Sequence, residues 1–565
     1  MTSPRFPEPP PSLPPTSLDA LDAVVQRVAA KKDAWAQLPI LARVALLHQM
    51  QEGLQREAAA WAATISQLKG IPEGSPLRGE DWLAGPASTA RNIRLLIEAL
   101  EQNGQPKPAA LVQRKSGQWT ARVFPANYLE KAAYRGWTID VWMEPGKEPT
   151  QGRIYRDKQE HGTLALVLGA GNVASIGPKD VLSKMFVDNC VCILKMNPVN
   201  EVGGPYVERA FKPLIDAGYL AVVYGGGDVG SHLTDHPLVD VIHMTGSDRT
   251  HDAILWGPTP AEQEKNKQQK TPRIQKPITS ELGCVTPVIV VPGDWSDQDL
   301  AFQAKNIAGM VAQNASFNCA AAKVVITWKG WSLRQKLLKK IEEELAATPA
   351  RKAYYPGAEQ RYANFVQKYP NAHVVGTPGE HVVPWTVLPD VPPQKGEYAL
   401  TQEAFCGVLA DTAVEATDVA DFMQKAVHFC NDEVWGTLSC IVVIDERTQK
   451  QHADRFDWMV EHLRYGGVAI NAWSGVLFGL CCSTWGAFPG HPLDNIESGR
   501  GVVHNTHMFD HPQKSVAKVP FRVVPAPVWF PVLNNLDELG ERLTRFEAAP
   551  SLLKLPGLLS AALKN

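Results

Sequence analysis

Short apolar runs that alternate with helix-compatible stretches are the feature that most constrains this chain. Val, Ile and Leu dominate these runs, which span residues 163–168, 191–194, 220–224 and 239–244. A run of this length that is apolar at nearly every position is typical of a strand covered on both faces. Strands separated by helices in this way predict an α/β fold with a doubly wound parallel sheet.

The regions around that sheet differ in texture. Residues up to about 16 are rich in Pro, which predicts a disordered or polyproline lead. Helical spacing of apolar residues begins after Ser17, a plausible N-cap. Residues 134–156 alternate and then break at Pro and Gly, which predicts an extended arm or hairpin. The polar, lysine-rich residues 257–277 predict a solvated surface loop, with a partner-binding element as the alternative.

Composition narrows the function classes. The 56 Lys and Arg residues nearly balance the 59 Asp and Glu residues, for a net charge of −3, and hydrophobic residues make up 44% of the chain. This balance argues against a nucleic-acid binder that relies on bulk electrostatics, and the apolar content argues against global disorder. The nine cysteines include no CxxC pair of the kind that binds metals, so we expect a reduced cytoplasmic protein without a metal site.

One stretch is apolar enough to suggest a membrane segment. Residues 465–493 contain no Asp, Glu, Lys or Arg. Gly, Ser, Asn and Pro interrupt the stretch repeatedly, however, which suits buried loop and strand better than a spanning helix. The first residues lead into the Pro-rich tract instead of an apolar signal region, so we expect neither membrane attachment nor secretion.

A glycine-rich segment follows the third apolar run. Residues 225–230 read Gly-Gly-Gly-Asp-Val-Gly and match G-x-G-x-x-G between a strand and a probable helix. In that setting backbone N–H groups can cradle a pyrophosphate. A tight turn without a ligand explains the segment equally well, because the only acid about twenty residues further on is Asp248.

Two other segments carry a more specific signal. Residues 279–284 read Thr-Ser-Glu-Leu-Gly-Cys before a strand, and residues 314–319 read Asn-Ala-Ser-Phe-Asn-Cys after a helix. They resemble the two active-site signatures of the aldehyde dehydrogenase superfamily, one with the catalytic glutamate and one with the nucleophilic cysteine. Further segments resemble family motifs in the family's order; they lie at residues 195–198, 236–247, 403–408 and 435–439.

The resemblance implies an aldehyde-dehydrogenase-like α/β architecture. A Rossmann-type NAD(P)-binding domain would comprise residues 17–135 and 160–280, and an α/β catalytic domain residues 281–490. Residues 136–159 and 500–530 would form an oligomerisation arm of a homodimer or homotetramer. Residues 531–565 depart from the family outline as a C-terminal extension of unknown role.

The resemblance also implies a catalytic trio. Cys319 would be the nucleophile, because a thiolate attacks an aldehyde carbon and leaves a hydrolysable thioester. Asn172 would steady the resulting oxyanion, and Glu281 would activate the water that hydrolyses the thioester. The alternatives are a buried apolar cysteine, a turn-forming asparagine, and a surface or helix-capping carboxylate.

By the same resemblance, several residues would bind NAD or NADP. Lys195 and Glu403 suit ribose hydroxyls, while Gly246 and Ser247 would lie at a helix N-terminus that faces pyrophosphate. Phe405 would wall the nicotinamide. A surface lysine, a solvated acid, an N-capping serine and a core phenylalanine are the respective alternatives.

Departures from the family pattern leave three points open. Pro198 occupies the position of an acid found in many NAD-preferring relatives, so NADP is admissible. Cys284 replaces the second glycine of the glutamate motif, and residues 485–491 depart from the usual downstream stretch. Bulky residues in that region fit a hydrophobic aldehyde, or are simply core: Trp473, Leu477, Phe478, Trp485 and Phe488.

The predicted reaction is therefore NAD(P)-dependent oxidation of an aldehyde to a carboxylic acid. A coenzyme A-acylating variant of the same fold is one alternative, which the presence of Glu281 disfavours. A nucleotide-binding scaffold without turnover is another, which the joint presence of Asn172, Glu281 and Cys319 disfavours.

Overall fold

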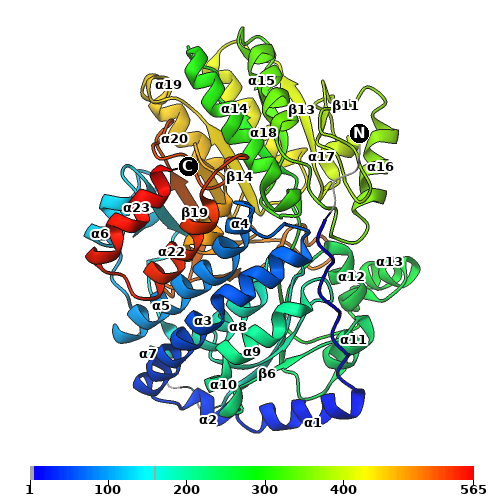
Figure 1. Ribbon diagram of the computed structural model, residues 1–565, viewed down its shortest axis with the longest axis vertical. Helices are drawn as coiled ribbons and strands as arrows, with labels where there is room; N and C mark the ends of the chain where they lie inside the picture. The colour runs from blue at the N-terminus through cyan, green and yellow to red at the C-terminus, as the bar shows by residue number, and fades with distance from the viewer. Residues whose placement is uncertain (1–5, 158, 160, 565) are drawn as a thin grey trace.

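The computed structural model describes residues 6–157, 159 and 161–564, and Figure 1 shows two halves, one above the other. Each half is built around one large sheet. The half drawn at the bottom holds a six-stranded sheet, and the half at the top an eleven-stranded one. Each sheet has its own large hydrophobic cluster. The confirmed α/β class therefore takes the form of two layered units.

The six-stranded sheet confirms the predicted doubly wound arrangement. Its central strands are parallel, and only its edge strand β17 runs antiparallel to its neighbour. The order is β17 (Gly499–Arg500), β8 (Ile278–Glu281), β7 (Val241–Thr245), β4 (Thr163–Leu168), β5 (Cys190–Lys195) and β6 (Leu220–Val223). Its helices are α1 (Leu18–Ala29), α2 (Lys32–Ala36), α3 (Ile40–Leu68), α4 (Arg78–Trp82), α5 (Ser88–Glu101), α8 (Ile176–Phe186), α9 (Gly204–Ala210), α10 (Lys212–Asp216), α11 (Gly227–Asp235) and α12 (Asp248–Trp256).

The eleven-stranded sheet combines a parallel centre with an antiparallel end. Its order is β1 (Ala110–Gln113), β2 (Trp119–Phe124), β3 (Thr138–Met143), β19 (Pro512–Lys518), β15 (Gly467–Ile470), β14 (Ser439–Val443), β9 (Thr286–Val290), β10 (Ala322–Trp328), β13 (Val408–Val414), β12 (Thr386–Leu388) and β11 (His373–Val374). The helices of this half are α14 (Asp297–Ala312), α15 (Arg334–Ala347), α16 (Ala358–Lys368), α17 (Tyr398–Thr401), α18 (Val419–Asp432), α19 (Glu446–Gln451), α20 (Ala453–His462) and α21 (Gly475–Leu480), with the short α6 (Tyr128–Ala133) and α7 (Arg153–Arg156) in the arm region.

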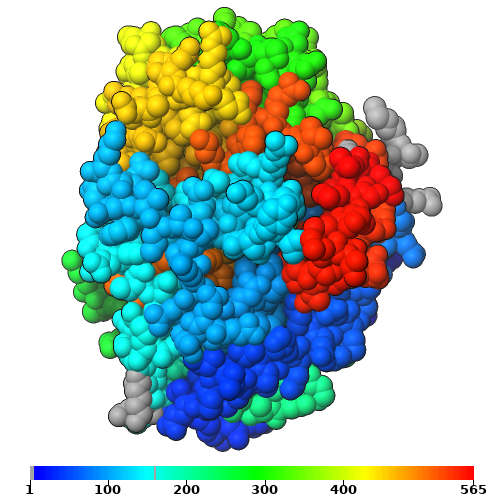
Figure 2. Space-filling view, turned by 90° about the vertical axis from the view of Figure 1, so that its left-hand side faces the viewer, coloured from blue at the N-terminus to red at the C-terminus, as the bar shows by residue number. Residues whose placement is uncertain are grey.

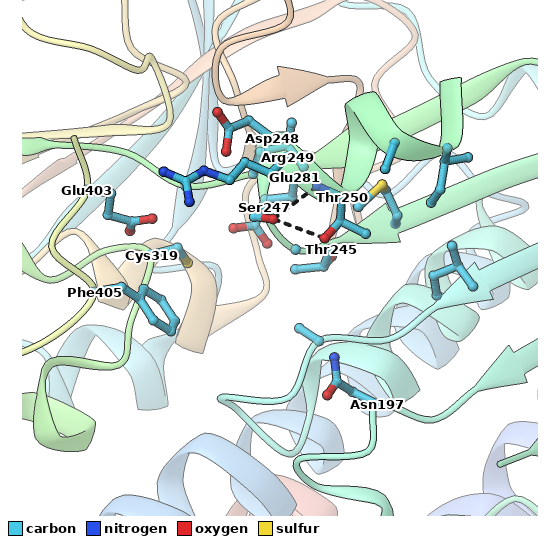
Figure 3. A pocket seen from close by; sticks show the side chains of 18 of the residues that line it. Asn197, Thr245, Ser247, Asp248, Arg249, Thr250, Glu281, Cys319, Glu403 and Phe405 are labelled. Atoms are coloured by element: carbon cyan, nitrogen blue, oxygen red, sulfur yellow. Dashed lines mark hydrogen bonds between the residues drawn. The ribbon is translucent and has the colours of Figure 1, made fainter. Parts of the chain in front are cut away.

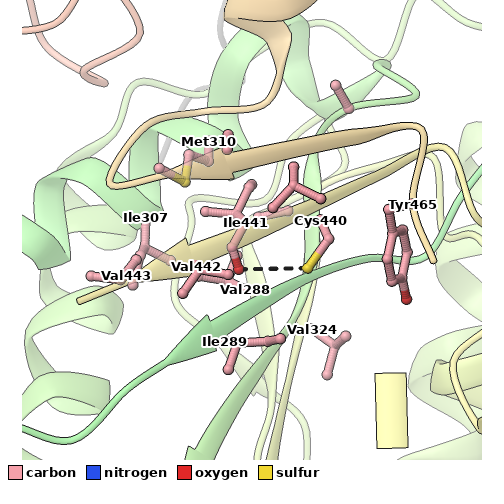
Figure 4. Packing of buried hydrophobic residues seen from close by; sticks show 14 of the residues in the cluster. Val288, Ile289, Ile307, Met310, Val324, Cys440, Ile441, Val442, Val443 and Tyr465 are labelled. Atoms are coloured by element: carbon pink, nitrogen blue, oxygen red, sulfur yellow. Dashed lines mark hydrogen bonds between the residues drawn. The ribbon is translucent and has the colours of Figure 1, made fainter. Parts of the chain in front are cut away.

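The centre of this second sheet is buried on both faces. Figure 4 shows side chains of β9, β10 and β14 packed with Ile307 and Met310 of α14. Val288, Val324 and Ile441 are fully buried. Burying a side chain of this type stabilises the fold by about 1.5–3 kcal/mol, so this core fixes the segments that lead into and out of its strands.

The arm lies differently from its expected boundaries. Residues 110–124 were assigned by sequence to the nucleotide-binding domain, but β1 pairs with β2 and β2 pairs with β3, so both strands extend the eleven-stranded sheet. β3 in turn pairs antiparallel with β19, which continues through β15 into the parallel centre. The physical reason is burial: Ala121, Val123 and Phe124 of β2 are fully buried in the hydrophobic cluster of the larger sheet.

The polar insertion is a helix instead of the predicted loop. Residues Pro260–Gln269 form α13, which projects from the molecule in Figure 1 and buries none of its side chains. A capping box explains why so polar a segment is helical: Thr259 accepts from the backbone of Glu262, and the Glu262 side chain accepts from Thr259.

The N-terminal lead also differs from the disorder expected of residues 1–16. Residues 1–5 lie outside the described residues, but residues 6–16 run extended along the half that holds the six-stranded sheet. The Leu13 amide donates to the Glu201 carboxylate at 2.9 Å, and Thr16 exchanges hydrogen bonds with the backbone of Tyr224. Pro cannot donate a hydrogen bond, so the non-Pro residues of the tract make these contacts.

The C-terminal extension packs on the N-terminal helices. Residues Leu536–Ala548 form α22 and residues Leu555–Leu563 form α23; Figure 2 shows this red segment against the cyan arm and the blue helices. Glu547 of α22 binds Arg91 at 2.9 Å and Arg94 at 2.6 Å, and Arg91 also binds Glu130 of α6 at 2.6 Å. Four charged groups from three distant segments are thus buried together.

Candidate active site

A cavity of about 990 Å³ lies between the two halves, at the carboxyl ends of the strands of the six-stranded sheet. Every site residue predicted from the sequence lines this one cavity: Asn172, Lys195, Gly246, Ser247, Glu281, Cys319, Glu403 and Phe405. Figure 3 shows Cys319, Glu403 and Phe405 at one end and Asn197 at the other. Ligands of α/β sheets bind at this edge, so the placement suits a binding site.

Cys319 follows a strained loop. The loop leaves α14 and places Asn314, Ala315 and Ser316 consecutively in the left-handed region, with φ of 54°, 54° and 65°. Each such residue costs of order 1–3 kcal/mol unless its surroundings hold it. Strain of this kind is typical of functional sites, where it fixes one side chain in one position.

Hydrogen bonds to the loop explain how the strain is held. The Asn314 side-chain amide donates to the backbone oxygen of Asn172 at 2.9 Å and to that of Phe317 at 2.8 Å. The Tyr354 hydroxyl donates to the same Asn172 oxygen at 3.1 Å and bonds the Asn314 side chain at 3.1 Å. The buried ammonium of Lys323 donates to both oxygens of Ser316. The loop and Asn172 are therefore one rigid unit.

Glu281 and Cys319 lie beside each other. The pKa of Glu281 is raised to about 7, mainly by burial; Asp180 also raises it, whereas the Cys319 thiol, the Trp485 indole and the Lys179 ammonium lower it. Burial and the neighbouring Glu281 raise the pKa of the Cys319 thiol well above its usual value. Ionising both groups at once is therefore unfavourable.

Asn172 lies between β4 and α8, next to the cysteine loop. Its side-chain amide donates to the Phe317 oxygen at 3.1 Å. A primary amide has two N–H groups, so a second donor is available to an oxygen in the cavity. Asn172 can both lie in the turn between β4 and α8 and stabilise an oxyanion, because the turn sets the direction of its side-chain amide.

At the other end of the cavity, two helix N-termini face the same space. Gly226 and Gly227 at the start of α11 line it, as do Gly246 and Ser247 before α12. Ser247 is also an N-cap, since its hydroxyl accepts from the Thr250 backbone at 3.1 Å. Burial lowers the pKa of Lys195, which stands at the end of β5. Helix N-termini and a cation together favour a phosphate group.

The Glu403 carboxylate lies against Gly283, which belongs to the segment that carries Glu281. A Cβ on Gly283 would collide with the Glu403 carboxylate, so only glycine allows this approach. Oε1 of Glu403 is buried and finds no hydrogen-bond partner among the described residues. Such an atom normally has a partner, and a ribose hydroxyl in the cavity would supply one. Cys284, which replaces a family glycine, does not line the cavity; its thiol is fully buried near the Ser439 oxygen.

Sequence reasoning missed several cavity residues. Arg249, Arg273 and Arg361 add positive charge to the lining, and Tyr355 packs its ring against Phe405 with centroids 5.0 Å apart. The guanidinium of Arg361 holds the loop by donating to the oxygens of Ala404 and Phe405. In the sequence these arginines look like ordinary surface arginines. Their position in the cavity lining is a property of the folded chain.

The aromatic residues of the downstream stretch are placed mainly as core. Trp473, Leu477, Phe478, Trp485 and Phe488 are absent from the cavity lining. Trp485 and Leu477 belong to the buried cluster of the larger sheet. Trp473 remains close to the nucleophile, because its indole donates to the Ala320 oxygen at 2.7 Å. Trp473 and Trp485 thus lie near Cys319 and Glu281 without lining the cavity.

Searches of the described residues add three findings. No helix of the described part is long and apolar enough to cross a membrane. Within the same residues, no group of three or more His, Cys, Asp or Glu side chains is arranged to hold a metal ion. All nine cysteines are free thiols.

Comparison with known proteins relates the chain to one family. The family model described as the aldehyde dehydrogenase family matches residues 182–478. N-succinylglutamate 5-semialdehyde dehydrogenase of Sphingopyxis alaskensis is 23% identical over 296 residues, which are 50% of this chain and 56% of that protein. The match thus spans little more than half the length of this relative.

Solved structures resemble the whole fold. The NADP-dependent glyceraldehyde-3-phosphate dehydrogenase of Bacillus halodurans, complexed with NADP, superposes with a TM-score of 0.57 at 18% identity, over 89% of this chain and 92% of that one. The aldehyde dehydrogenase of Mycobacterium tuberculosis, complexed with NAD+, gives a TM-score of 0.58 at 17% identity, over 89% and 91%.

Proposed function

Because this chain belongs to the aldehyde dehydrogenase family, we propose that it is an NAD(P)-dependent aldehyde dehydrogenase that oxidises an aldehyde to a carboxylic acid. One observation carries the proposal: Asn172, Glu281 and Cys319, from distant parts of the chain, meet in a single cavity that also holds the predicted cofactor residues. The names of the similar proteins agree with this activity.

In the first step, the Cys319 thiol attacks the aldehyde carbon. Glu281 accepts the thiol proton, for which its raised pKa of about 7 suits it. The second N–H of Asn172 donates to the aldehyde oxygen as negative charge develops there. One such donor lowers the activation free energy by roughly 3 kcal/mol in a dry site. The rigid loop keeps the sulfur in place for the attack.

In the second step, a water molecule releases the acid from Cys319. Glu281, once ionised, takes a proton from this water as it attacks the thioester carbon. Burial keeps the carboxylate basic enough for this task at neutral pH. The Cys319 thiolate leaves and recovers a proton, which restores the starting state.

The lining of the cavity suits a nicotinamide dinucleotide. Lys195 and Glu403 would bind ribose hydroxyls, the turn at Gly246 and Ser247 would bind pyrophosphate, and Phe405 would face the nicotinamide. The bound cofactor supplies the hydride acceptor for the thiohemiacetal carbon. The orphaned oxygen of Glu403 and the paired helix N-termini support this assignment.

Both NAD and NADP fit the adenosine end of the cavity. The nearest acid, Glu201, is occupied by the Leu13 amide at 2.9 Å and does not line the cavity. Asn197, Ser231 and Thr234 line this region with Lys195 instead. Glu201 and Asp228 lie near Lys195, but neither lines the cavity, so we expect the enzyme to accept NADP as well as NAD.

Substrate, assembly and location complete the proposal. The aromatic rings of Tyr355, Phe405 and Trp435 along the cavity support a hydrophobic aldehyde.

The exposed edge strand β1 carries Leu111 and Val112 with about half of their surface free, which supports assembly as a homodimer or homotetramer. Nine free thiols support a cytoplasmic location.

Replacement of the nucleophile tests the activity directly. Cys319→Ala should abolish reduction of NAD(P)+ in the presence of aldehydes, while cofactor binding, followed by fluorescence, survives. Cys284→Ala is the matched control, since this thiol is buried outside the cavity. Turnover by Cys319→Ala would remove Cys319 from the mechanism.

Replacement of the base tests the second step. Glu281→Gln should stall release of the acid and let an acyl-enzyme accumulate, visible as an added mass on Cys319. Wild-type assays with and without coenzyme A, followed by product analysis, separate hydrolysis from acyl transfer. An unchanged steady-state rate without a trapped acyl group would contradict the role of Glu281.

A further inference from the structure

A polar ladder lies on one face of the strand pair β7 and β8, where a helix covers the sheet. The parallel register places His243 beside Thr279 and Thr245 beside Glu281. Side chains two residues apart in a strand share a face, so these four point the same way. The His243 ring bonds the Thr279 hydroxyl at 2.9 Å. A buried face of this kind is normally apolar.

Asp180 of α8 bridges the two steps of the ladder. Its carboxylate accepts from the Thr245 hydroxyl at 3.0 Å and lies 3.5 Å from Nε2 of His243. Asp180 and His243 are 1% and 3% exposed, so neither group is in bulk solvent. Asp180 is also close enough to Glu281 to raise its pKa. The ladder therefore begins at the proposed catalytic base.

Unpartnered polar atoms surround the ladder. Oε1 of Glu281, Nε2 of His243 and Nε1 of Trp485 are buried and make no hydrogen bond of ordinary geometry among the described residues, although the Trp485 indole lies near enough to the Glu281 carboxylate to lower its pKa. Both ring nitrogens of His504 are in the same condition. An imidazole always presents one donor or more, and buried polar atoms are normally paired with protein or with ordered water. This concentration of orphaned atoms indicates a place for bound water.

Packing brings these atoms to one region. β16 (Trp485–Gly486) pairs with β18 (Val502–Val503), and His504 follows β18 directly. The Phe478 ring lies between them: its centroid is 6.0 Å from that of Trp485 and 4.7 Å from that of His504. The Lys179 ammonium stands 3.3 Å from the same ring. The charged and titratable groups facing the region are Cys319, Glu281, Asp180, Lys179, His243 and His504.

We propose that Asp180 and His243, with water held among the orphaned atoms, form a proton outlet that carries the proton of Glu281 away from the active site toward Thr279. The inference rests on the proposed function, which loads Glu281 with a proton in every turnover. A cofactor in the cleft would separate Glu281 from solvent on that side, so a second route has a purpose. Asp180 and His243 are positioning and relay residues, not catalytic residues.

The transfer moves one proton and changes no oxidation state. Protonated Glu281 gives its proton through water to the Asp180 carboxylate. Asp180 passes it to Nε2 of His243, and the ring releases its Nδ1 proton to the Thr279 hydroxyl, which hands its own proton to solvent. Thr279 is half-buried, whereas Ser280 and Glu281 are buried, so the ladder leads outward.

His243→Gln is the central test, because glutamine keeps a polar side chain between Asp180 and the Thr279 hydroxyl but does not carry a proton as imidazole does. We expect the first turnover, seen as a burst of NAD(P)H, to match the wild type. The steady-state rate should fall roughly tenfold, with a larger solvent deuterium isotope effect. Added imidazole should restore part of the rate. Asp180→Asn should act alike, and the double variant should be no slower than either single one.

His507→Gln is the matched control: this buried ring bonds only the Cys482 oxygen, at 3.1 Å, and lies off the ladder. Melting curves of all variants separate misfolding from a relay defect. A steady-state rate of His243→Gln and Asp180→Asn equal to the wild type, or a loss that imidazole and other small buffers leave unchanged, would overturn the proposal. Failure of the proposed function would differ, since the wild type would then give no burst.

Discussion

At the scale of residues, the site depends on side chains that the fold holds in unfavourable states. The three left-handed residues before Cys319 are tied by Asn314, Tyr354 and Lys323. Glu281 is kept from solvent, so its pKa rises to about 7. Both features raise the free energy of the folded state at the place where we propose the chemistry, as is common at functional sites.

The raised pKa of Glu281 predicts the pH dependence of activity. The base must be ionised to accept a proton, and burial favours its neutral form, so activity should be half-maximal near pH 7 and should approach its full value above about pH 8. Well below about pH 7, kcat should fall by about tenfold per pH unit. Steady-state rates between pH 5 and 9 measure this. A limb centred near pH 4.5 would show that Glu281 is not the titrating base.

Tyr354→Phe should loosen the cysteine loop. The change removes the hydroxyl that bonds both Asn172 and Asn314, at 3.1 Å each. We expect kcat/KM to fall about tenfold because the sulfur and the amide lose their fixed spacing. The free energy of unfolding should fall by only about 1–2 kcal/mol. Tyr362→Phe, which loses a bond to Thr386 away from the cavity, is the control; equal activity losses in both variants would contradict a local effect.

The sequence predicted the site only where a local pattern carries the chemistry. The segments around Glu281 and Cys319 have fixed spacing, and both residues line the cavity. Asp180 and His243 left no such signal, because a polar residue at alternate positions of a strand is ordinary at a solvated face. Only the tertiary structure shows that α8 covers this face of β7 and β8. The roles of all of these residues stay predictions until they are tested.

At the scale of elements, α22 is held to the nucleotide-binding half by charge. Burial works against the ionised form of Glu547, but Arg91 and Arg94 hold the pKa of its carboxyl below the usual range. The same two arginines lie on α5, and Glu130 on α6 completes the group. A helix that approaches from the opposite end of the sequence is thus fixed in register on the N-terminal helices.

Glu547→Ala should release this helix at high cost. The change leaves Arg91 and Arg94 buried without their shared partner, for which we expect a loss of 3–5 kcal/mol in the free energy of unfolding. Urea titration followed by circular dichroism measures it. Glu541→Ala is the control on the same helix: its pair with Arg545 is solvent-exposed and should contribute less than about 1 kcal/mol. Similar midpoints for the two variants would contradict the prediction.

Elements were predictable where hydrophobic periodicity decides them. The parallel strands were found because both of their faces are buried, which leaves an unbroken apolar run. α13 was taken for a loop because none of its side chains is buried and it has no apolar face. The pairing of β1 and β2 with the arm was also missed, since sequence proximity to α5 says nothing about which sheet a strand joins.

At the scale of the whole molecule, the cavity joins the two halves. Lys195, Gly246 and Glu281 come from the six-stranded sheet, whereas Cys319 and Glu403 come from the other half. Any ligand that fills the cavity must therefore contact both cores. The packing of the halves, and not either half alone, sets the distance between the proposed cofactor and nucleophile.

A bridging cofactor should stabilise the entire molecule. At a hundredfold excess over Kd, a ligand that binds only the folded state adds about 2.7 kcal/mol. NAD+ and NADP+ should each raise the melting temperature measured by scanning fluorimetry, and Cys319→Ala should show the same rise. Glu403→Gln should show a smaller one, because it weakens the acceptor for a ribose hydroxyl. Equal shifts in the wild type and Glu403→Gln would contradict the assignment of Glu403.

The ion pair between Glu547 and Arg91 has a consequence for folding during synthesis. These partners are 456 residues apart in the sequence, so the ribosome releases the arginine long before the glutamate that neutralises it. Domains usually fold in the order in which they emerge. Arg91 and Arg94 have the nearby partners Glu130 and Glu98, at 2.6 Å each, but the carboxylate that both arginines share is made several hundred residues later. The N-terminal helices therefore gain their full set of ion pairs only after α22 has been synthesised.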